Sequence, residues 1–124
     1  MSDESIQGKE SETENVESLH NYQLFVRSTK VYAEEHHLIY PVLGLVNEAG
    51  EVAGKVKKLM RDDDGQLTQE RFDDIVSELG DVLWYVTAVA DDLGVSISDV
   101  FYENFVKIKS RAQRGVIKGN GDNR

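Results

Sequence analysis

Apolar side chains recur every three or four positions through most of the chain, the spacing that places them on one side of an α-helix. The pattern predicts four helices, over about residues 19–36, 41–61, 68–93 and 96–112. The first is expected to end near His36 and His37, which we interpret as helix-end residues and not as metal ligands. We therefore expect an all-α domain.

Residues with preferred places at helix ends mark these boundaries. Pro41, the only proline, suits the first turn of the second helix, where its missing N–H has no partner to lose. Thr68 and Ser96 are expected to cap the third and fourth helices. Gly94 is expected to end the third helix, and the aspartate-rich residues 62–65 are expected to form a solvated turn.

The second and third helices carry the same short sequence, Glu-x-Gly-acid-Val. It supplies Glu48 and Glu51 in one helix and Glu78 and Asp81 in the other. A helix turns about 100° per residue, so acids three positions apart lie about 60° apart on one side. Measured from Glu48 or Glu78, the apolar stripe falls at about 20–80° and the second acid at about 300° in both helices. Four carboxylates thus border two apolar stripes, which we expect to pack against each other.

This repetition favours a metal site over a solvated helix edge, which is the usual interpretation of a single acidic pair. Packing the two stripes brings like charges together, and partly buried carboxylates repel one another unless a cation compensates. Four oxygen donors without sulfur suit a hard divalent ion, either Mg²⁺ or Mn²⁺.

The fourth helix carries a basic and amidic flank where the other two carry acids. Asn104, Lys107 and Arg111 border its apolar stripe, and Lys55 follows Glu51 by one turn in the second helix. Lys55 is also placed for a simple i, i+4 ion pair with Glu51, and this alternative stays open. Metal ions together with cations beside a groove are what a polyphosphate substrate needs.

Net charge, cysteine content and hydropathy exclude several classes of function. The net charge of −9 argues against a general nucleic-acid binder. There are no cysteines, which excludes disulfides and thiolate metal sites and allows a reducing cytoplasm. No apolar run approaches the roughly 20 residues that span a bilayer, and the first residues lack the features of a signal peptide. We therefore expect a cytoplasmic protein that is not bound to a membrane.

The chain divides into three parts by composition. Residues 1–18 form a Ser/Glu/Asn-rich acidic tail that we expect to be disordered. Residues 19–114 form the helical domain. Residues 115–124 are too glycine-rich to be helical, and we expect either a frayed end or a loop folded over the site.

The motifs resemble those of the MazG-type all-α nucleoside triphosphate pyrophosphohydrolases. The likeness covers about residues 19–121 and rests on the two acidic motifs and on several short sequences around them: Tyr40-Pro41, Gly44-Leu45, Gly50-Glu51-Val52, Lys55, Lys57-Lys58, Glu78 to Tyr85, Asn104-x-x-Lys107, and Ser110-Arg111 with Arg114-Gly115. This chain shows no departure at the acidic positions.

The resemblance implies a four-helix MazG-like bundle that hydrolyses an NTP or dNTP to the monophosphate and pyrophosphate with Mg²⁺. It implies that the four acids are metal ligands and catalytic residues, that Lys107, Arg111 and Lys55 hold phosphate oxygens, and that Asn104 is a hydrogen-bonding partner. Trp84 and Tyr85 are candidates for stacking on a base, although an aromatic residue in a small helical domain is more often part of the core or of an interface. The alternative is an inactive helical module that only binds a partner or serves a structural role.

The resemblance also implies assembly as a homodimer or a dimer of dimers, and two glycines support it independently. Gly50 and Gly80 occupy the same position in their helices, about 200° from Glu48 and Glu78. Glycine inside a helix is less favourable than alanine by roughly 1 kcal/mol. A close approach by the backbone of a second chain would explain both.

Overall fold

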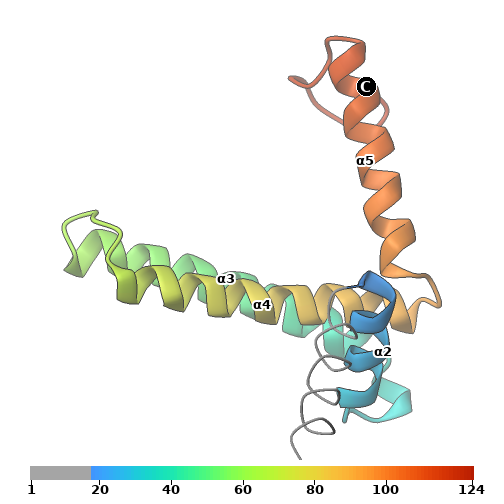
Figure 1. Cartoon of the computed structure of the whole chain (residues 1–124), viewed down its shortest axis with the longest axis horizontal. Coiled ribbons are helices and arrows are strands. Elements are labelled where there is room, and N and C mark those ends of the chain that lie inside the picture. Colours follow the sequence, from blue (N-terminus) through green and yellow to red (C-terminus); the bar gives the residue numbers. More distant parts are fainter. Residues whose placement is uncertain (1–17) are drawn as a thin grey trace, which may run out of the picture.

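The computed structural model describes residues 18–124, and these residues form four α-helices joined by short connections (Figure 1). The prediction of an all-α chain is confirmed for this part. The acidic tail predicted for the first residues lies outside the described residues, apart from Ser18. The elements are α2 (Leu19–Thr29), the 3-10 turn η1 (Glu34–His36), α3 (Ile39–Asp62), α4 (Gln69–Asp92) and α5 (Ile97–Gln113).

Two long antiparallel helices, α3 and α4, pack along their length and form a hairpin that gives the molecule its longest dimension (Figure 1). Helix α2 crosses the end of this hairpin that is opposite to the α3–α4 loop. Helix α5 leaves the same end at a steep angle and packs only against α2 and α4 among the described elements. The molecule therefore has two arms, with the α3–α4 hairpin in one and α5 in the other.

The predicted helix ends are confirmed by their hydrogen bonds. The Thr68 hydroxyl accepts from the Arg71 N–H at 3.2 Å, and the Ser96 hydroxyl accepts from the Asp99 N–H at 3.0 Å. Gly94 has φ +72°, a backbone conformation that glycine adopts without a steric penalty, and it follows Leu93, the C-cap of α4. Capping residues in the sequence therefore locate the ends of the hairpin correctly.

The first helix is shorter than its periodicity predicts, because α2 ends at Thr29 and not near His36. The following residues are extended since their side chains bind the end of α4. Lys30 reaches Asp91 at 2.6 Å and Asp92 at 2.8 Å, and the Tyr32 hydroxyl donates to Asp92 at 2.9 Å. These long-range contacts compete with helix continuation, and no local pattern reveals them.

Asp92 is the centre of this connection, and its side chain is completely buried. Besides Lys30 and Tyr32 it accepts a hydrogen bond from the backbone N–H of Leu38 at 2.8 Å. Leu38 has φ +66°, which is strained for a bulky residue. Burial by itself would raise the pKa of Asp92, but the donors from Leu38, Lys30 and Tyr32 outweigh it and lower this pKa.

Asp91 binds the cations of α2 beside it. Arg27 pairs with Asp91 at 2.7 Å, and Gln23 donates to the same carboxylate at 3.1 Å. The hydrogen bonds from Arg27 hold the pKa of Asp91 far below its usual value, against the effect of burial. The carbonyl oxygen of Gln23 accepts from the N–H of Ile97 at 2.7 Å, so α2 also fixes the start of α5.

The apolar core is small and lies where α2, α4 and α5 meet. Its buried hydrophobic residues are Val26, Ala88, Ala90 and Ile97. Many larger apolar side chains along α3, α4 and α5 stay exposed, among them Val46 at 67% and Phe101 at 65%. Soluble monomers rarely leave such continuous apolar surface open to water. None of the described helices has the length and apolarity needed to cross a bilayer.

We predict that Asp92→Ala lowers the free energy of unfolding by about 3 kcal/mol, because it leaves the Leu38 N–H and the Tyr32 hydroxyl without their acceptor and removes one of the two carboxylates that pair with Lys30. Denaturant titration at neutral pH measures this loss. Asp62→Ala is the control, since Asp62 pairs with the exposed Arg61 at the far end of the hairpin and is itself 43% exposed. An equal loss in both variants would contradict the central role of Asp92.

Asp91 and Asp92 also predict how the stability of the fold changes as the pH falls. Both aspartates have a lowered pKa in the folded state, so they stabilise the fold above the usual aspartate pKa of about 4, and this stability is lost as the pH falls below that value. Asp92→Ala should therefore flatten the decline in melting temperature between neutral and acidic pH.

Candidate metal centre

Three of the four predicted acids meet between the two helices of the hairpin. Glu48 comes from α3, and Glu78 and Asp81 come from α4; each offers a carboxylate oxygen within 4.8 Å of the others. Glu48 and Glu78 are half-buried and Asp81 is exposed. The apolar stripes beside them pack helix against helix, and this packing forces the carboxylates together.

The charge balance of this cluster is unfavourable without a cation. Burial raises the pKa of Glu48, and the negative charges of Asp81 and Glu78 raise it further, as does a hydrogen bond with Glu78. No lysine or arginine among residues 18–124 forms an ion pair with any of the three. Oxygen donors that repel one another fit a hard divalent cation such as Mg²⁺, which would neutralise them.

The two other predicted site residues on α3, Glu51 and Lys55, are not part of this cluster of three carboxylates. Glu51 is exposed and lies outside the group of three carboxylates, and Lys55 is half-buried one turn further along α3. The identical wheel positions of the two motifs predicted four equivalent acids. The structure brings together three, and Glu51 stays close enough for its negative charge to contribute to the raised pKa of Glu48.

An open pocket of about 330 Å³ lies next to the acids and is lined by Glu48, Asp81, Trp84 and Tyr85. The indole N–H of Trp84 donates to the Thr29 hydroxyl at 2.9 Å, which fixes the ring against α2. The Trp84 and Tyr85 rings meet edge to face, with centroids 5.0 Å apart. Aromatic side chains and carboxylates therefore share one cavity.

The Tyr85 ring packs directly against the backbone of Gly44 in α3. A Cβ on Gly44 would collide with the Tyr85 ring, so only glycine lets the two helices approach there. Burial raises the pKa of Tyr85, with further contributions from Tyr40 and the negative charge of Glu48. The hydroxyl of Tyr85 therefore lies close enough to the acids for their negative charge to act on it.

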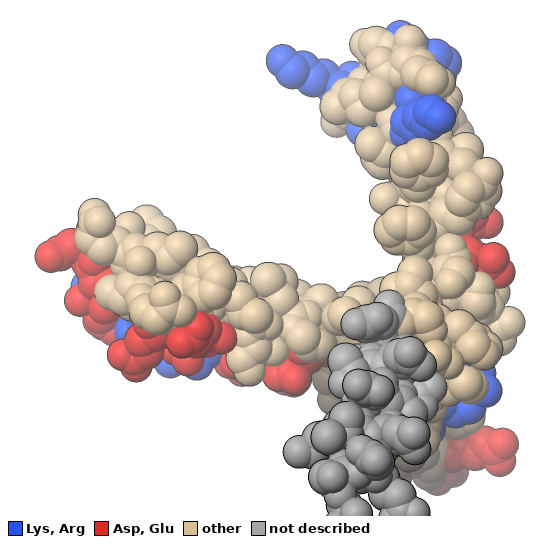
Figure 2. Space-filling view, viewed as in Figure 1, with Lys and Arg blue, Asp and Glu red and all other residues tan. Residues whose placement is uncertain are grey.

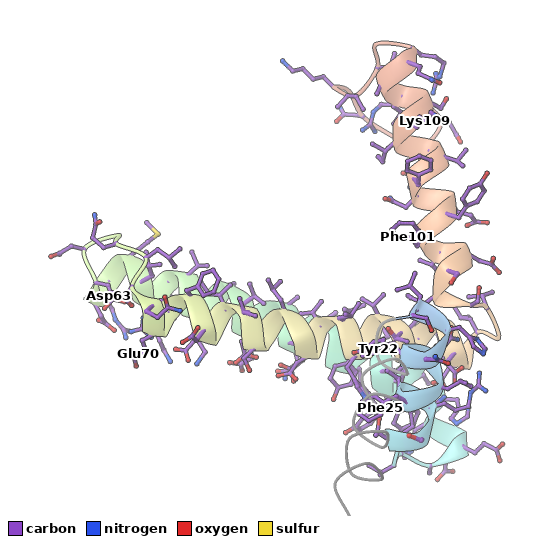
Figure 3. All side chains as sticks on the ribbon, in the orientation of Figure 1. Tyr22, Phe25, Asp63, Glu70, Phe101 and Lys109 are labelled. Carbon is purple, nitrogen blue, oxygen red and sulfur yellow. The ribbon has the colours of Figure 1, made fainter. Side chains whose placement is uncertain are left out.

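The sequence analysis missed two tyrosines near the site. The pKa of Tyr22 in α2 is raised by burial and by the charge of Asp81, and Tyr40 stacks on Tyr32 with ring centroids 4.8 Å apart. Figure 3 shows Tyr22 on α2 next to the end of the hairpin. Tyr22 lies in the apolar pattern of its own helix, and no local signal places it beside an acid sixty residues away.

The basic flank of α5 does not reach the acids of its own chain. Asn104 and Lys107 are exposed, and Arg111 is buried under the C-terminal residues. Arg111 donates to the Asp122 carbonyl at 3.0 Å, and its guanidinium lies 3.5 Å from the Asp122 carboxylate. The glycine-rich end is thus a loop folded over α5 and not over the acids.

A helical hairpin with an oxygen-donor cluster and an adjoining aromatic pocket defines a class of all-α proteins suited to a metal and a small ligand. The chain belongs to the family of the MazG nucleotide pyrophosphohydrolase domain, which matches residues 36–116. The matched segment contains the three acids, both aromatic residues of the pocket and all of α5, whereas α2 lies outside it.

A relative from a bacteriophage extends the comparison to most of the chain. The chain is 49% identical over 109 residues to "Gene 37 protein" of Mycobacterium phage L5, and the match covers 83% of this chain and 96% of the relative. The relative's name states no activity. No solved structure matches the chain.

We predict that Gly44→Ala lowers the free energy of unfolding by about 1–3 kcal/mol, because the added methyl group displaces Tyr85 from a packed site. Gly54→Ala is the control in the same helix, since a Cβ there meets nothing within 4 Å. It should instead stabilise the helix by about 0.5–1 kcal/mol. Denaturant titration measures both, and a Gly44→Ala protein as stable as the wild type would disprove the contact.

Proposed function

We propose that the chain is a nucleoside triphosphate pyrophosphohydrolase that depends on Mg²⁺, with Mn²⁺ as a possible substitute. It converts an NTP or dNTP to the nucleoside monophosphate and pyrophosphate. The observation that carries the proposal is the meeting of Glu48, Glu78 and Asp81 within 4.8 Å beside the Trp84 pocket. Membership of the pyrophosphohydrolase family supports the reaction class.

Glu48, Glu78 and Asp81 would hold the metal, and Glu51 would complete the set from the exposed side of α3. A divalent ion bound there supplies charge for the phosphate oxygens and lowers the pKa of water. The reaction adds water across the α–β anhydride. The water oxygen bonds to the α-phosphorus, the bridging oxygen leaves with pyrophosphate, and one of the carboxylates takes the released proton.

The chain's other residues would bind and orient the nucleotide. Trp84 has its indole N–H tied to Thr29 and so presents a fixed aromatic surface for a base. Lys55 is placed one turn beyond the acids for a phosphate oxygen. Asn104, Lys107 and Arg111, on the separate α5 arm, would supply the remaining hydrogen-bond donors.

We further propose that the protein works in the cytoplasm on free nucleotides, as a homodimer or a dimer of dimers. The net charge of −9 disfavours nucleic acid as a substrate, because the phosphate backbone is repelled. Gly50 and Gly80 support an assembly, since a Cβ at either position would meet nothing within 4 Å in a single chain.

Product identity tests the reaction. Incubation with Mg²⁺ and a panel of NTPs and dNTPs, resolved by chromatography, should release NMP and pyrophosphate from at least one of them. Release of NDP and orthophosphate would exclude cleavage at the α-phosphorus. Binding without turnover across the whole panel would favour an inactive binding module.

Replacing Glu78 with glutamine tests the acids, because it keeps the shape and removes the charge. Turnover should fall by about 100-fold or more. Mg²⁺ should raise the melting temperature of the wild type but not of Glu78→Gln, and the variant without metal should be at least as stable as the metal-free wild type. Glu70→Gln, in the first turn of the same helix, is the control. Equal rates in both variants would show that Glu78 is only a solvated residue at the edge of its helix.

A further inference from the structure

The C-terminal loop, residues 115–124, folds back along the end of α5 that points away from the hairpin (Figure 1). It begins at Gly115, whose φ of +70° turns the chain out of the helix direction. The Arg114 guanidinium donates to the carbonyl oxygen of Arg124 at 2.7 Å, so the two ends of the loop are tied together. No other described helix lies beside this end of α5.

Arg124 holds the loop together from within. Its guanidinium donates to the carbonyl oxygens of Gly121 at 2.6 Å, Val116 at 3.2 Å and Ile117 at 3.2 Å. None of these three bonds involves a side chain of α5. The loop therefore has a shape of its own, and it can leave the surface of α5 without losing these bonds.

The loop covers Arg111, a residue of the last turn of α5 that is only 5% exposed. The Nη2 of Arg111 donates to the carbonyl oxygen of Asp122 at 3.0 Å. The Nε of Arg111 is buried and has no hydrogen-bond partner in the described part of the chain. Leaving a buried donor without an acceptor costs free energy. The closed loop therefore satisfies the Arg111 guanidinium only in part.

Asp122 brings the only carboxylate side chain of the loop to two cations of α5. This carboxylate lies 3.5 Å from the Arg111 guanidinium and 4.0 Å from the Lys107 ammonium, and the Asp122 side chain is 90% exposed. Direct hydrogen bonds between ionised partners are shorter, at about 2.7–2.9 Å. Both contacts are therefore weak attractions screened by solvent.

The surrounding segment is otherwise cationic. Between residues 107 and 124, Asp122 is the one acidic side chain, and the basic ones are Lys107, Lys109, Arg111, Arg114, Lys118 and Arg124. Figure 2 shows Lys and Arg gathered at this end of the α5 arm. Positive charge concentrated in this way attracts anions. The Asp122 carboxylate therefore competes with any phosphate group for the same donors.

We propose that Asp122 holds the place of a phosphate group on Lys107 and Arg111, and that the C-terminal loop lifts from α5 when a polyphosphate binds. A phosphate group offers two oxygens to the guanidinium fork, so it satisfies the Nε that the closed loop leaves without a partner. It also carries more negative charge than one carboxylate. The closed loop is thus an inhibitory contact that a triphosphate displaces more readily than a monophosphate does.

This proposal rests on the proposed function, because it describes how access to the cations of that same site is controlled. Arg111 cannot donate to a phosphate oxygen while the loop buries its guanidinium. Movement of the loop is therefore required if Arg111 binds the substrate.

The position of the loop can be measured without turnover. The chain has no cysteine, so Asn123→Cys takes a single nitroxide spin label at an exposed position of the loop. Inorganic triphosphate, added with and without Mg²⁺, should increase the mobility of this label in electron paramagnetic resonance spectra. Orthophosphate at the same concentration should increase it less. Glu103→Cys, exposed on α5, is the control and should not respond.

Two results of this measurement would overturn the proposal. The first is a label at position 123 whose mobility stays unchanged with triphosphate, both with and without Mg²⁺. The second is an equal response of the two labels, because it would report a general change in the protein and not a movement of the loop.

Steady-state kinetics tests the competition by Asp122. Asp122→Asn removes the charge and keeps the size, so it should lower the KM for the nucleotide by about 2–5-fold, as expected for loss of an exposed ion pair, and leave kcat unchanged. Asp99→Asn is the control, because it changes the net charge equally but lies twelve residues before Arg111. That separation is about 18 Å along the helix axis, beyond the Debye length of about 8 Å, so the KM should not change.

A KM that is unchanged or higher in Asp122→Asn, or lowered equally in both variants, would show that the loop only ends the helix and would overturn the proposal. The spin label separates this outcome from a failure of the proposed function. A wild type without turnover whose loop label still gains mobility with triphosphate would refute the reaction and support the displaced loop. Turnover with a loop that does not respond would refute the displaced loop and leave the reaction intact.

Discussion

The neighbouring aspartates at the end of α4 are the interaction on which the placement of the other elements depends. The C-terminal end of a helix already carries partial negative charge, so Asp91 and Asp92 are stable there only with cations and donors around them. Arg27 and Lys30 supply the cations, and the N–H of Leu38 supplies a donor. These contacts fix α2 across the hairpin and hold the strained turn that starts α3.

The acid cluster results from a balance between apolar packing and charge repulsion. Two carboxylates about 4 Å apart near a protein surface repel by about 4 kcal/mol. Half-buried side chains such as Leu45, Val52 and Ile75 each contribute about 1 kcal/mol, and the stripes contain several of them. Packing therefore prevails, and the pKa of Glu48 is raised first by burial and then by the negative charges of Asp81 and Glu78. A divalent cation bound there would remove the repulsion and so would stabilise the hairpin.

Much of the apolar surface of the described residues stays exposed. A chain that buries only a few apolar side chains at the meeting point of α2, α4 and α5 leaves much of the hydrophobic stabilisation unused. Covering those surfaces would recover it.

Local sequence determined the helices and the chemistry of the site, and the tertiary structure decided which of those residues meet. Helical spacing and capping residues such as Thr68 and Ser96 depend on neighbours within one or two turns, so they are legible in the sequence. The matched wheel positions of Glu48 and Glu78 identified the acid cluster for the same reason. The early end of α2 depends on ion pairs sixty residues apart, and no periodicity encodes them. The direction of α5 is likewise beyond local pattern, because it is set by contacts at its first turn with Gln23. The sequence therefore supplied acids and cations to one predicted site, and only the fold showed that a single chain holds them apart.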